Sequence, residues 1–221
     1  MAPNSSPAAD AGGTVPGLWK TFVASTGVLA ISLACVWQAT AGGNAFTTET
    51  LRRTEVEQAP RALPDLMLVD ADGRRASLPA LLATGQRVWI VDFVYTRCQT
   101  VCSALGGVFQ QLQQQVTERG LQDRIGLLSI SFDPAHDSPA VLRDYARRMR
   151  MDAAIWQLAT LAAPQDRRAL LDAFGIMVIP APLGEFEHNA ALHVVRGGRL
   201  VQILDYEQAT QAIAAALAAA P

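Results

Sequence analysis

The spacing of apolar residues changes repeatedly after residue 60, and each change predicts a different element. Val88–Tyr95 is continuously apolar apart from one aspartate, as expected for a strand buried on both faces, and Ile125–Phe132 repeats this pattern. Between them, Ser103–Arg119 places its apolar residues at the spacing of one helix face. A strand, a helix and a strand in this order predict a βαβ unit with parallel strands.

Two hairpins and further helices are expected around this unit. Leu63–Leu81 alternates apolar and polar residues around the turn dipeptide Asp72-Gly73. Ala190–Val195 and Leu200–Leu204 flank a Gly-Gly turn. The remaining expected elements are helices over Pro139–Arg150, Gln165–Phe174 and Glu207–Ala220 and a short strand over Ala154–Leu158. This order predicts an α/β fold, namely a three-layer, thioredoxin-like domain with an N-terminal β-hairpin.

The N-terminal part of the chain has a different composition. We expect a disordered tail over residues 1–18, a membrane anchor over 19–41, a linker over 42–60 and the globular domain over 61–221. No charged residue stands between Thr21 and Thr48, and Thr21–Trp37 reaches the lower length limit for a membrane-spanning helix. Trp19 and Trp37 bracket this stretch as interfacial anchors do. A single N-terminal transmembrane helix is therefore expected.

Two other interpretations of this leader stay open. It could be a signal peptide that is cleaved after Ala39-Thr40-Ala41, which has the A-x-A pattern. It could also be lipidated at Cys35. All three interpretations place the following domain outside the cytoplasm. We expect a single-pass protein of the inner (cytoplasmic) membrane whose C-terminal domain lies in the periplasm or an equivalent exported space.

Composition and charge exclude one class of partner. The chain has 221 residues, of which 50% are hydrophobic and 17% are charged. Its 18 basic and 20 acidic residues give a net charge of −2. The basic residues form no long run that could follow a phosphate backbone. We therefore expect no nucleic-acid partner.

The candidate chemistry lies where the first buried strand gives way to a helix. Cys98 and Cys102 stand at this changeover, with three residues between them. On one turn of helix their Cβ atoms would be about 5–6 Å apart, whereas a disulfide needs about 3.5–4.5 Å. The spacing therefore suits the capture of a soft metal ion and tolerates reversible oxidation. A helix N-terminus favours the thiolate form that both chemistries require.

Several chemistries compete for this cysteine pair. A thioredoxin-type redox motif has two intervening residues rather than three, and a structural disulfide that closes so small a loop stabilises little. Zinc prefers four ligands, whereas two thiolates and one imidazole suit copper. The third ligand would be His136, His188 or His193. His188 is the best placed, because it stands just before the last predicted hairpin.

Two aspartates carry expectations of their own. Asp92 interrupts the first buried strand, and we expect it to satisfy a local polar group or, alternatively, to tune the pKa of a cysteine. Asp137 follows the second strand, where a turn or a helix cap is expected.

Together these motifs resemble the Sco/SenC family. The resemblance runs from about Leu63 to Tyr206, and its specific parts are Tyr95–Cys102 (YTRCQTVC), Ser131–Leu142 (SFDPAHDSPAVL) and a histidine before the last hairpin. The sequence also departs from the family pattern. Gln99 and Ser103 stand where family members usually have proline, and Glu187 stands where aspartate is usual.

The resemblance implies a membrane-anchored copper protein that assists the assembly of cytochrome oxidase. Cys98, Cys102 and His188 would be its copper ligands, for Cu(I), Cu(II) or both, with Asp133 close to the site. Its partners would be the copper-site subunit of a respiratory oxidase and other copper chaperones. The main alternative is a thiol–disulfide oxidoreductase that keeps the cysteines of an oxidase subunit reduced for metal loading, with Cys98 and Cys102 as catalytic residues. A third interpretation is a peroxide-reducing or redox-sensing thiol protein.

Overall fold

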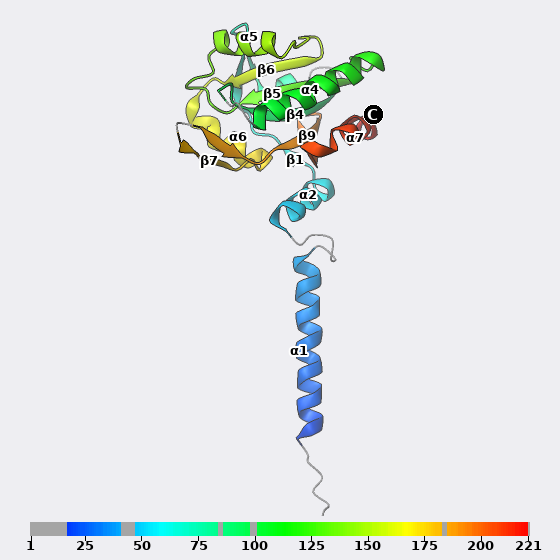
Figure 1. Cartoon of the computed structure of the whole chain (residues 1–221). Coiled ribbons are helices and arrows are strands. Elements are labelled where there is room, and N and C mark those ends of the chain that lie inside the picture. Colours follow the sequence, from blue (N-terminus) through cyan, green and yellow to red (C-terminus); the bar gives the residue numbers. More distant parts are fainter. Residues whose placement is uncertain (1–16, 41–46, 84–85, 98–100, 183–184, 221) are drawn as a thin grey trace, which may run out of the picture. The chain divides into compact units, whose positions relative to one another are not determined.

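The computed structural model describes residues 17–40, 47–83, 86–97, 101–182 and 185–220. The chain divides into two compact units, Met1–Leu51 and Arg52–Pro221. The elements of both are labelled in Figure 1.

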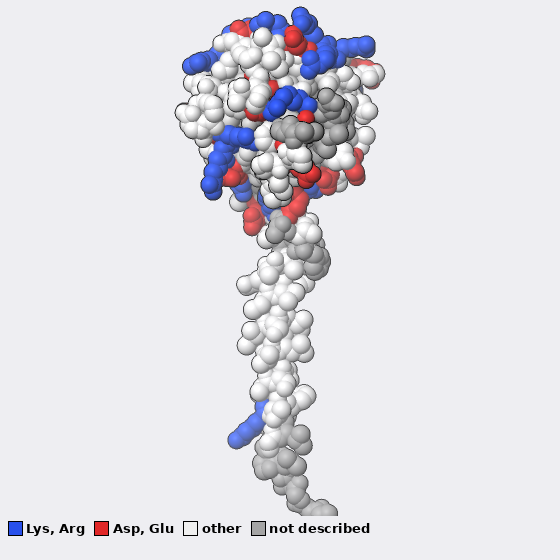
Figure 2. Space-filling view, turned by 60° about the vertical axis from the view of Figure 1, so that its left-hand side comes forward, with Lys and Arg blue, Asp and Glu red and all other residues white. Residues whose placement is uncertain are grey.

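The first unit contains one long apolar helix, α1 (Leu18–Ala39). Its segment Trp19–Ala39 is long and apolar enough to cross a membrane. The surface of this helix carries almost no charge (Figure 2), and Cys35 is exposed on it as a free thiol. The helix is a candidate membrane span, in agreement with the expectation for this part of the chain.

The second unit is a mixed α/β domain, preceded by a helix that starts in the first unit. Its helices are α2 (Thr48–Gln58), α3 (Leu78–Leu82), α4 (Val101–Glu118), α5 (Pro139–Arg148), α6 (Arg167–Phe174) and α7 (Ala209–Ala219). Its strands are β1 (Arg61–Ala62), β2 (Met67–Asp70), β3 (Arg75–Ser77), β4 (Val88–Val94), β5 (Ile125–Ser131), β6 (Trp156–Leu161), β7 (Val178–Pro180), β8 (Phe186–His188), β9 (Ala191–Arg196) and β10 (Arg199–Asp205).

Eight of these strands form one sheet in the order β1-β10-β9-β4-β5-β6-β2-β3. The central strands β4, β5 and β6 are parallel, and the two hairpins β2–β3 and β9–β10 pair antiparallel to β6 and β4. The carboxyl ends of β4 and β5 therefore lie at the same edge of the sheet. Residues 98–102, which carry the two cysteines and are called the cysteine turn below, follow the end of β4 in the sequence, and Asp133 follows the end of β5.

Helices cover both faces of the sheet, as the three-layer prediction requires (Figure 1). Alternate residues of β4 point to opposite faces. Val91 and Phe93 belong to a core with Leu170 and Phe174 of α6, and α3 contributes to the same core. Ile90, on the other face, packs with apolar residues of α4 and α7.

One glycine lets the central strands pack closely. A Cβ atom on Gly126 of β5 would lie 2.6 Å from the ring of Trp89, its register partner on β4. Real Cβ contacts are not that short, so a larger residue at this position would displace the buried indole.

Several elements were not expected from the sequence. Among them are β1 and α3, the latter at the end of the segment expected to form the first hairpin. Most of the polar stretch before Pro60, which was expected to be a linker, forms α2. The proline-containing stretch after Ile176 forms a small two-stranded sheet of β7 and β8, with Val178 opposite His188. His188 therefore ends its own strand rather than merely preceding β9.

Candidate functional site

The structure describes only part of the predicted ligand set. Cys98 lies outside the described residues, as does the side chain of Cys102, whose backbone belongs to the first turn of α4. Among the side chains that are described, no three His, Cys, Asp or Glu residues gather as a metal site. The described groups that bear on the site come from the end of β4, from the turn after β5 and from β8.

Asp137 holds the end of β4 immediately before the cysteine turn. Its carboxylate accepts hydrogen bonds from the backbone N–H of Thr96 (3.0 Å) and from the Thr96 hydroxyl (2.5 Å). The hydroxyl of Ser131, at the end of β5, donates to the same carboxylate. Asp137 is fully buried. A turn or cap alone therefore does not describe Asp137, because its side chain also links the end of β4 to the end of β5.

Arg97, the residue before Cys98, is fixed by a second carboxylate. Its guanidinium donates to Asp133 at 2.9 Å, and Nδ1 of His136 lies 3.1 Å from the same carboxyl group. Burial acts to raise the pKa of Asp133, but the hydrogen bonds from His136 and Arg97 outweigh it, and the pKa lies below its ordinary value. A carboxylate paired in this way keeps a guanidinium beside the cysteine turn.

His188 sits among aromatic rings on β8. Its ring centroid lies 5.3 Å from that of Phe132 and 6.3 Å from that of Tyr95. Burial lowers the pKa of His188 below its ordinary value, against a smaller opposing effect of the hydrogen bond to the carbonyl of Asn189. The imidazole is therefore neutral at pH 7, which is the form that binds metals. Because Nδ1 lies 3.2 Å from that carbonyl oxygen, Nδ1 carries the proton and Nε2 carries the lone pair.

The other two histidines differ in what they could do. His193 is fully buried in β9, and its two ring nitrogens each lie 3.2 Å from a backbone carbonyl oxygen, of Val91 and of Phe174. These contacts leave it no role as a ligand. His136 lies at the predicted sheet edge, 3.4 Å from Arg97, but it is engaged with Asp133. The geometry thus favours His188 over both.

Asp92 contradicts the expectation that it satisfies a polar neighbour. It is fully buried in β4, and neither carboxyl oxygen has a hydrogen-bond partner among the described groups. Burial raises the pKa of Asp92 to about 7. The hydroxyl of Ser129, its register partner on β5, acts in the opposite direction but offsets only part of this rise. The two groups do not form a hydrogen bond of ordinary geometry. This carboxyl group is therefore largely protonated below neutral pH.

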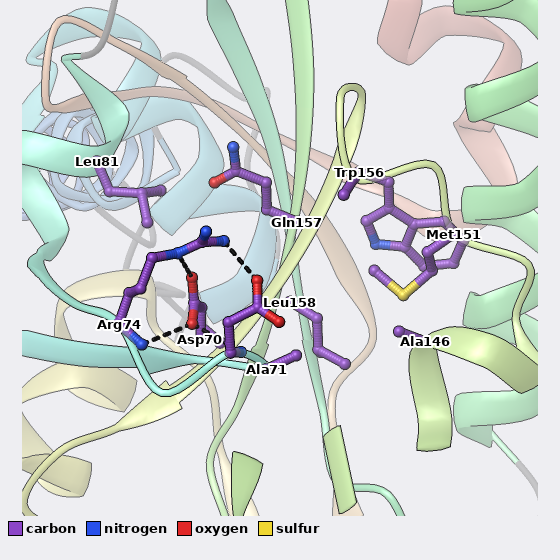
Figure 3. Close-up of a pocket in the computed structure, with 12 residues that line it drawn as sticks. Asp70, Ala71, Arg74, Leu81, Ala146, Met151, Trp156, Gln157 and Leu158 are labelled. Carbon is purple, nitrogen blue, oxygen red and sulfur yellow. Dashed lines mark hydrogen bonds and ion pairs between the residues drawn. The ribbon is translucent and has the colours of Figure 1, made fainter. Parts of the chain in front are cut away.

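A cavity of about 300 Å³ lies between β2, α5 and the first residues of β6 (Figure 3). Arg74 binds both Asp70, at 2.8 Å, and Asp72, at 2.7 Å, there. Its described lining includes none of the predicted ligands. It lies toward the start of β6, whereas the cysteine turn follows the end of β4.

Sequence reasoning missed the side chains that hold the site together. Thr96 and Arg97 were recognised only as part of a motif, and their bonds to Asp137 and Asp133 connect two turns that are distant in sequence. Tyr95 was missed in the same way. Its hydroxyl lies within hydrogen-bond distance of Glu185 and Phe186, next to β8 and within it. The one available signal was that all three residues immediately precede Cys98.

Comparison with protein families gives a match over most of the chain. The sequence model of the SCO1/SenC family matches residues 55–220. A curated relative, a SCO1 protein homolog of Bacillus subtilis, is 30% identical over 89 residues, which is 40% of this chain. The matched part spans about 44% of that relative's length.

Solved structures share the fold of the second unit. BsSco, described as a member of the Sco family of cytochrome c oxidase assembly proteins with a disulfide switch, matches with a TM-score of 0.59 and 21% identity over 72% of this chain and 94% of its own. Copper-bound ScoI of Arabidopsis thaliana matches with a TM-score of 0.58 and 15% identity over 72% and 96%. These matches confirm the thioredoxin-like fold.

Proposed function

The chain belongs to the SCO1/SenC family, and from this premise we propose that it binds copper and delivers it to the copper site of a respiratory cytochrome oxidase. The proposed ligands are the thiolates of Cys98 and Cys102 and the imidazole of His188. Thiolates suit Cu(I), and imidazole suits copper in either oxidation state. Copper is the cargo here, and a site with three protein donors leaves room for a donor of the recipient.

The observation that carries the proposal is the state and position of His188. It is a neutral, half-buried imidazole whose lone pair lies on Nε2. Its ring packs against Tyr95, which stands three residues before Cys98 at the end of β4. The histidine strand thus lies next to the end of β4, from which the chain runs on to Cys98.

The proposed location follows from α1. As a membrane span it would hold the domain at the outer surface of the inner membrane, in the periplasm or an equivalent compartment. The oxidase subunit that receives copper would meet the domain there, as would other copper chaperones. Soluble copper donors and membrane-bound acceptors can both reach a site on such an anchored domain.

The test is copper binding by the reduced full-length protein in detergent. We expect one copper ion per chain, and loss of it in Cys98→Ser and Cys102→Ser. His188→Ala should weaken Cu(II) binding by at least about a hundredfold. Loss of a residue that only hydrogen-bonds to a metal ligand already lowers the affinity by about 10- to 100-fold, and loss of the ligand itself should lower it further. His136→Ala is the matched control and should bind copper normally. Full affinity in His188→Ala, or a loss in His136→Ala alone, would refute this ligand set.

A second candidate function is favoured by the position of Cys102 in the first turn of α4, since a helix N-terminus favours thiolates. In a thiol–disulfide exchange, one thiolate of the pair would attack a disulfide of the oxidase subunit, and the other would resolve the mixed disulfide. The chain would end with a Cys98–Cys102 disulfide, and the target would gain two thiols. His188→Ala would be nearly silent in such an assay, so this one variant separates the two functions.

A further inference from the structure

The side chain of Tyr95 connects the strand that leads to the cysteine turn with the strand that carries His188. Tyr95 follows β4 and is 1% exposed. Its hydroxyl lies 2.7 Å from the carboxylate of Glu185 and 3.0 Å from the carbonyl oxygen of Phe186. The backbone N–H of Phe186 donates to the same hydroxyl at 3.2 Å. One buried oxygen therefore meets three groups at the start of β8.

A phenol has one hydrogen to donate, and this decides how the contacts are used. The carboxylate of Glu185 is the nearer acceptor and is charged, so it takes the phenolic hydrogen, and the hydroxyl oxygen accepts from Phe186 N–H. Phe186 is thereby held through its backbone, which leaves its ring free to pack. The ring lies edge-to-face with that of Tyr95, at 5.3 Å between centroids.

The strand pair β7–β8 needs such a connection, because it is not part of the eight-stranded sheet. At its far end, Asn189, the residue after His188, accepts a hydrogen bond from Met177 N–H at 2.7 Å and donates to the carbonyl oxygen of Gly175 at 3.2 Å, which connects this end to the residues before β7 and not to β4. The other described contacts of β8 with the main domain are ring contacts. Phe186 and His188 pack against Phe132, and the guanidinium of Arg167 lies over the ring of Phe186 at 4.7 Å. Ring contacts restrict distance more than direction, whereas the hydrogen bonds of Tyr95 fix the backbone of β8 to the end of β4.

We propose that Tyr95 is a positioning residue whose hydroxyl holds β8 against the end of β4 and so places His188 beside the cysteine turn before copper arrives. The inference rests on the proposed function in one respect, namely that His188 is a copper ligand. A ligand held in advance costs less ordering free energy on binding, and a displacement of about 1 Å is enough to weaken a site.

The first test needs no copper. Amide hydrogen exchange is measured on the reduced, metal-free full-length protein in detergent, for wild type and Tyr95→Phe. Peptides that cover residues 185–190 should exchange about tenfold faster in the variant, as expected from the loss of a hydrogen bond to a charged group. Peptides from β5 (Ile125–Ser131) report global stability and should change less. Unchanged exchange at 185–190 would overturn the inference.

Two further variants keep this test specific. Tyr206→Phe is the matched control, because that tyrosine also donates to a glutamate, Glu207 at 3.3 Å, but before α7. It should leave exchange at 185–190 unchanged. Glu185→Ala removes only the acceptor at a partly exposed position and should give a smaller acceleration than Tyr95→Phe. If both controls match Tyr95→Phe, the effect is not local, and the inference fails.

The second test uses copper. Tyr95→Phe should lower the affinity for Cu(II) by about tenfold and change the Cu(II) absorption or electron paramagnetic resonance spectrum, whereas Cu(I), held by the two thiolates, should change less. If wild type binds no copper but exchange still accelerates, the proposed function fails and the connection between β4 and β8 stands. If copper binds normally in Tyr95→Phe with an unaltered spectrum, the positioning role fails and the proposed function stands.

Discussion

Asp137 and Asp92 are both fully buried, yet their surroundings are opposite. Asp137 accepts hydrogen bonds from Thr96 and Ser131, and so joins the ends of two strands. Asp92 lies inside β4 with no hydrogen-bond partner among the described groups, and burial raises its pKa to about 7. Donors surround the first carboxyl group, whereas the second keeps its proton to a higher pH than an ordinary aspartate.

The difference shows that burial alone does not determine what a carboxyl group does. A buried carboxyl group that accepts hydrogen bonds, such as that of Asp137, fixes the position of the groups that donate to it, here Thr96 and Ser131. A buried carboxyl group without donors, such as that of Asp92, instead keeps its proton to a higher pH. Three substitutions test this contrast. Asp137→Ala removes the acceptor, Asp92→Asn removes the titrating proton, and Thr96→Val removes one of the donors to Asp137.

Asp137→Ala should have the largest effect. It leaves the Thr96 N–H and the hydroxyls of Thr96 and Ser131 without their acceptor, so we expect the free energy of unfolding to fall by about 4 kcal/mol. Urea denaturation at pH 7 measures this change. Asp144→Ala is the control, because Asp144 is an exposed partner of Arg147, and its loss should cost less than about 1 kcal/mol. Equal losses of stability for the two variants would mean that Asp137 does not link the ends of β4 and β5.

Asp92→Asn should have the next largest effect, and its sign depends on pH. In the unfolded chain Asp92 loses its proton near pH 4, whereas in the folded protein it keeps it to about pH 7. The stability that the neutral acid provides is thus complete below pH 4 and is lost as the pH rises through 7. Asparagine has nearly the same shape and no proton to lose. At pH 8 the variant should therefore be more stable than wild type, by about 2 to 4 kcal/mol.

At pH 4 the two proteins should be almost equally stable, and the measurement is the free energy of unfolding between pH 4 and pH 8. Asp137→Ala provides the contrast, because its deficit should persist at pH 8. If the difference between wild type and Asp92→Asn does not grow with pH, then Asp92 is not held as a neutral acid.

Thr96→Val should have the smallest effect. Valine keeps the shape of threonine and the backbone N–H, so only the hydroxyl bond to Asp137 is lost. We expect the free energy of unfolding to fall by about 1 kcal/mol, which denaturation with replicate measurements can resolve. A loss as large as that of Asp137→Ala would mean that the hydroxyl of Thr96 accounts for the whole stabilising effect of Asp137.

Most of the fold could be predicted from the sequence because its central strands are apolar runs. β4 and β5 are buried on both faces, and α4 repeats apolar residues on one face. β7 and β8 could not be predicted in this way, since they are short, contain Pro180 and bury only some of their residues. The helix α2 was missed because its charged residues suggested a linker, although it buries Val56.

The candidate site could be predicted less completely, for a physical reason. Residue types and spacing predicted Cys98, Cys102 and His188 as ligands, and this set stays a prediction, because Cys98 and the side chain of Cys102 lie outside the described residues. The choice among three histidines depends on burial and on the partners of each ring nitrogen. The bond between Thr96 and Asp137 connects residues 41 positions apart, and the bond between Tyr95 and Glu185 connects residues 90 positions apart. Such pairings depend on the sheet order, which periodicity does not determine.

The indole of Trp156 gives the sheet a built-in optical indicator. Its Nε1–H donates to the hydroxyl of Ser129 at 2.9 Å, and Ser129 is the register partner of Asp92. A charge that appears on Asp92 therefore changes the electric field at a buried indole, and with it the wavelength of its fluorescence. Trp19 and Trp37 are exposed on α1, so they contribute a background that does not follow this proton. In a Trp89→Phe variant, which removes the other buried tryptophan, emission recorded against pH would thus follow the ionisation of Asp92 inside the folded domain, without any attached label.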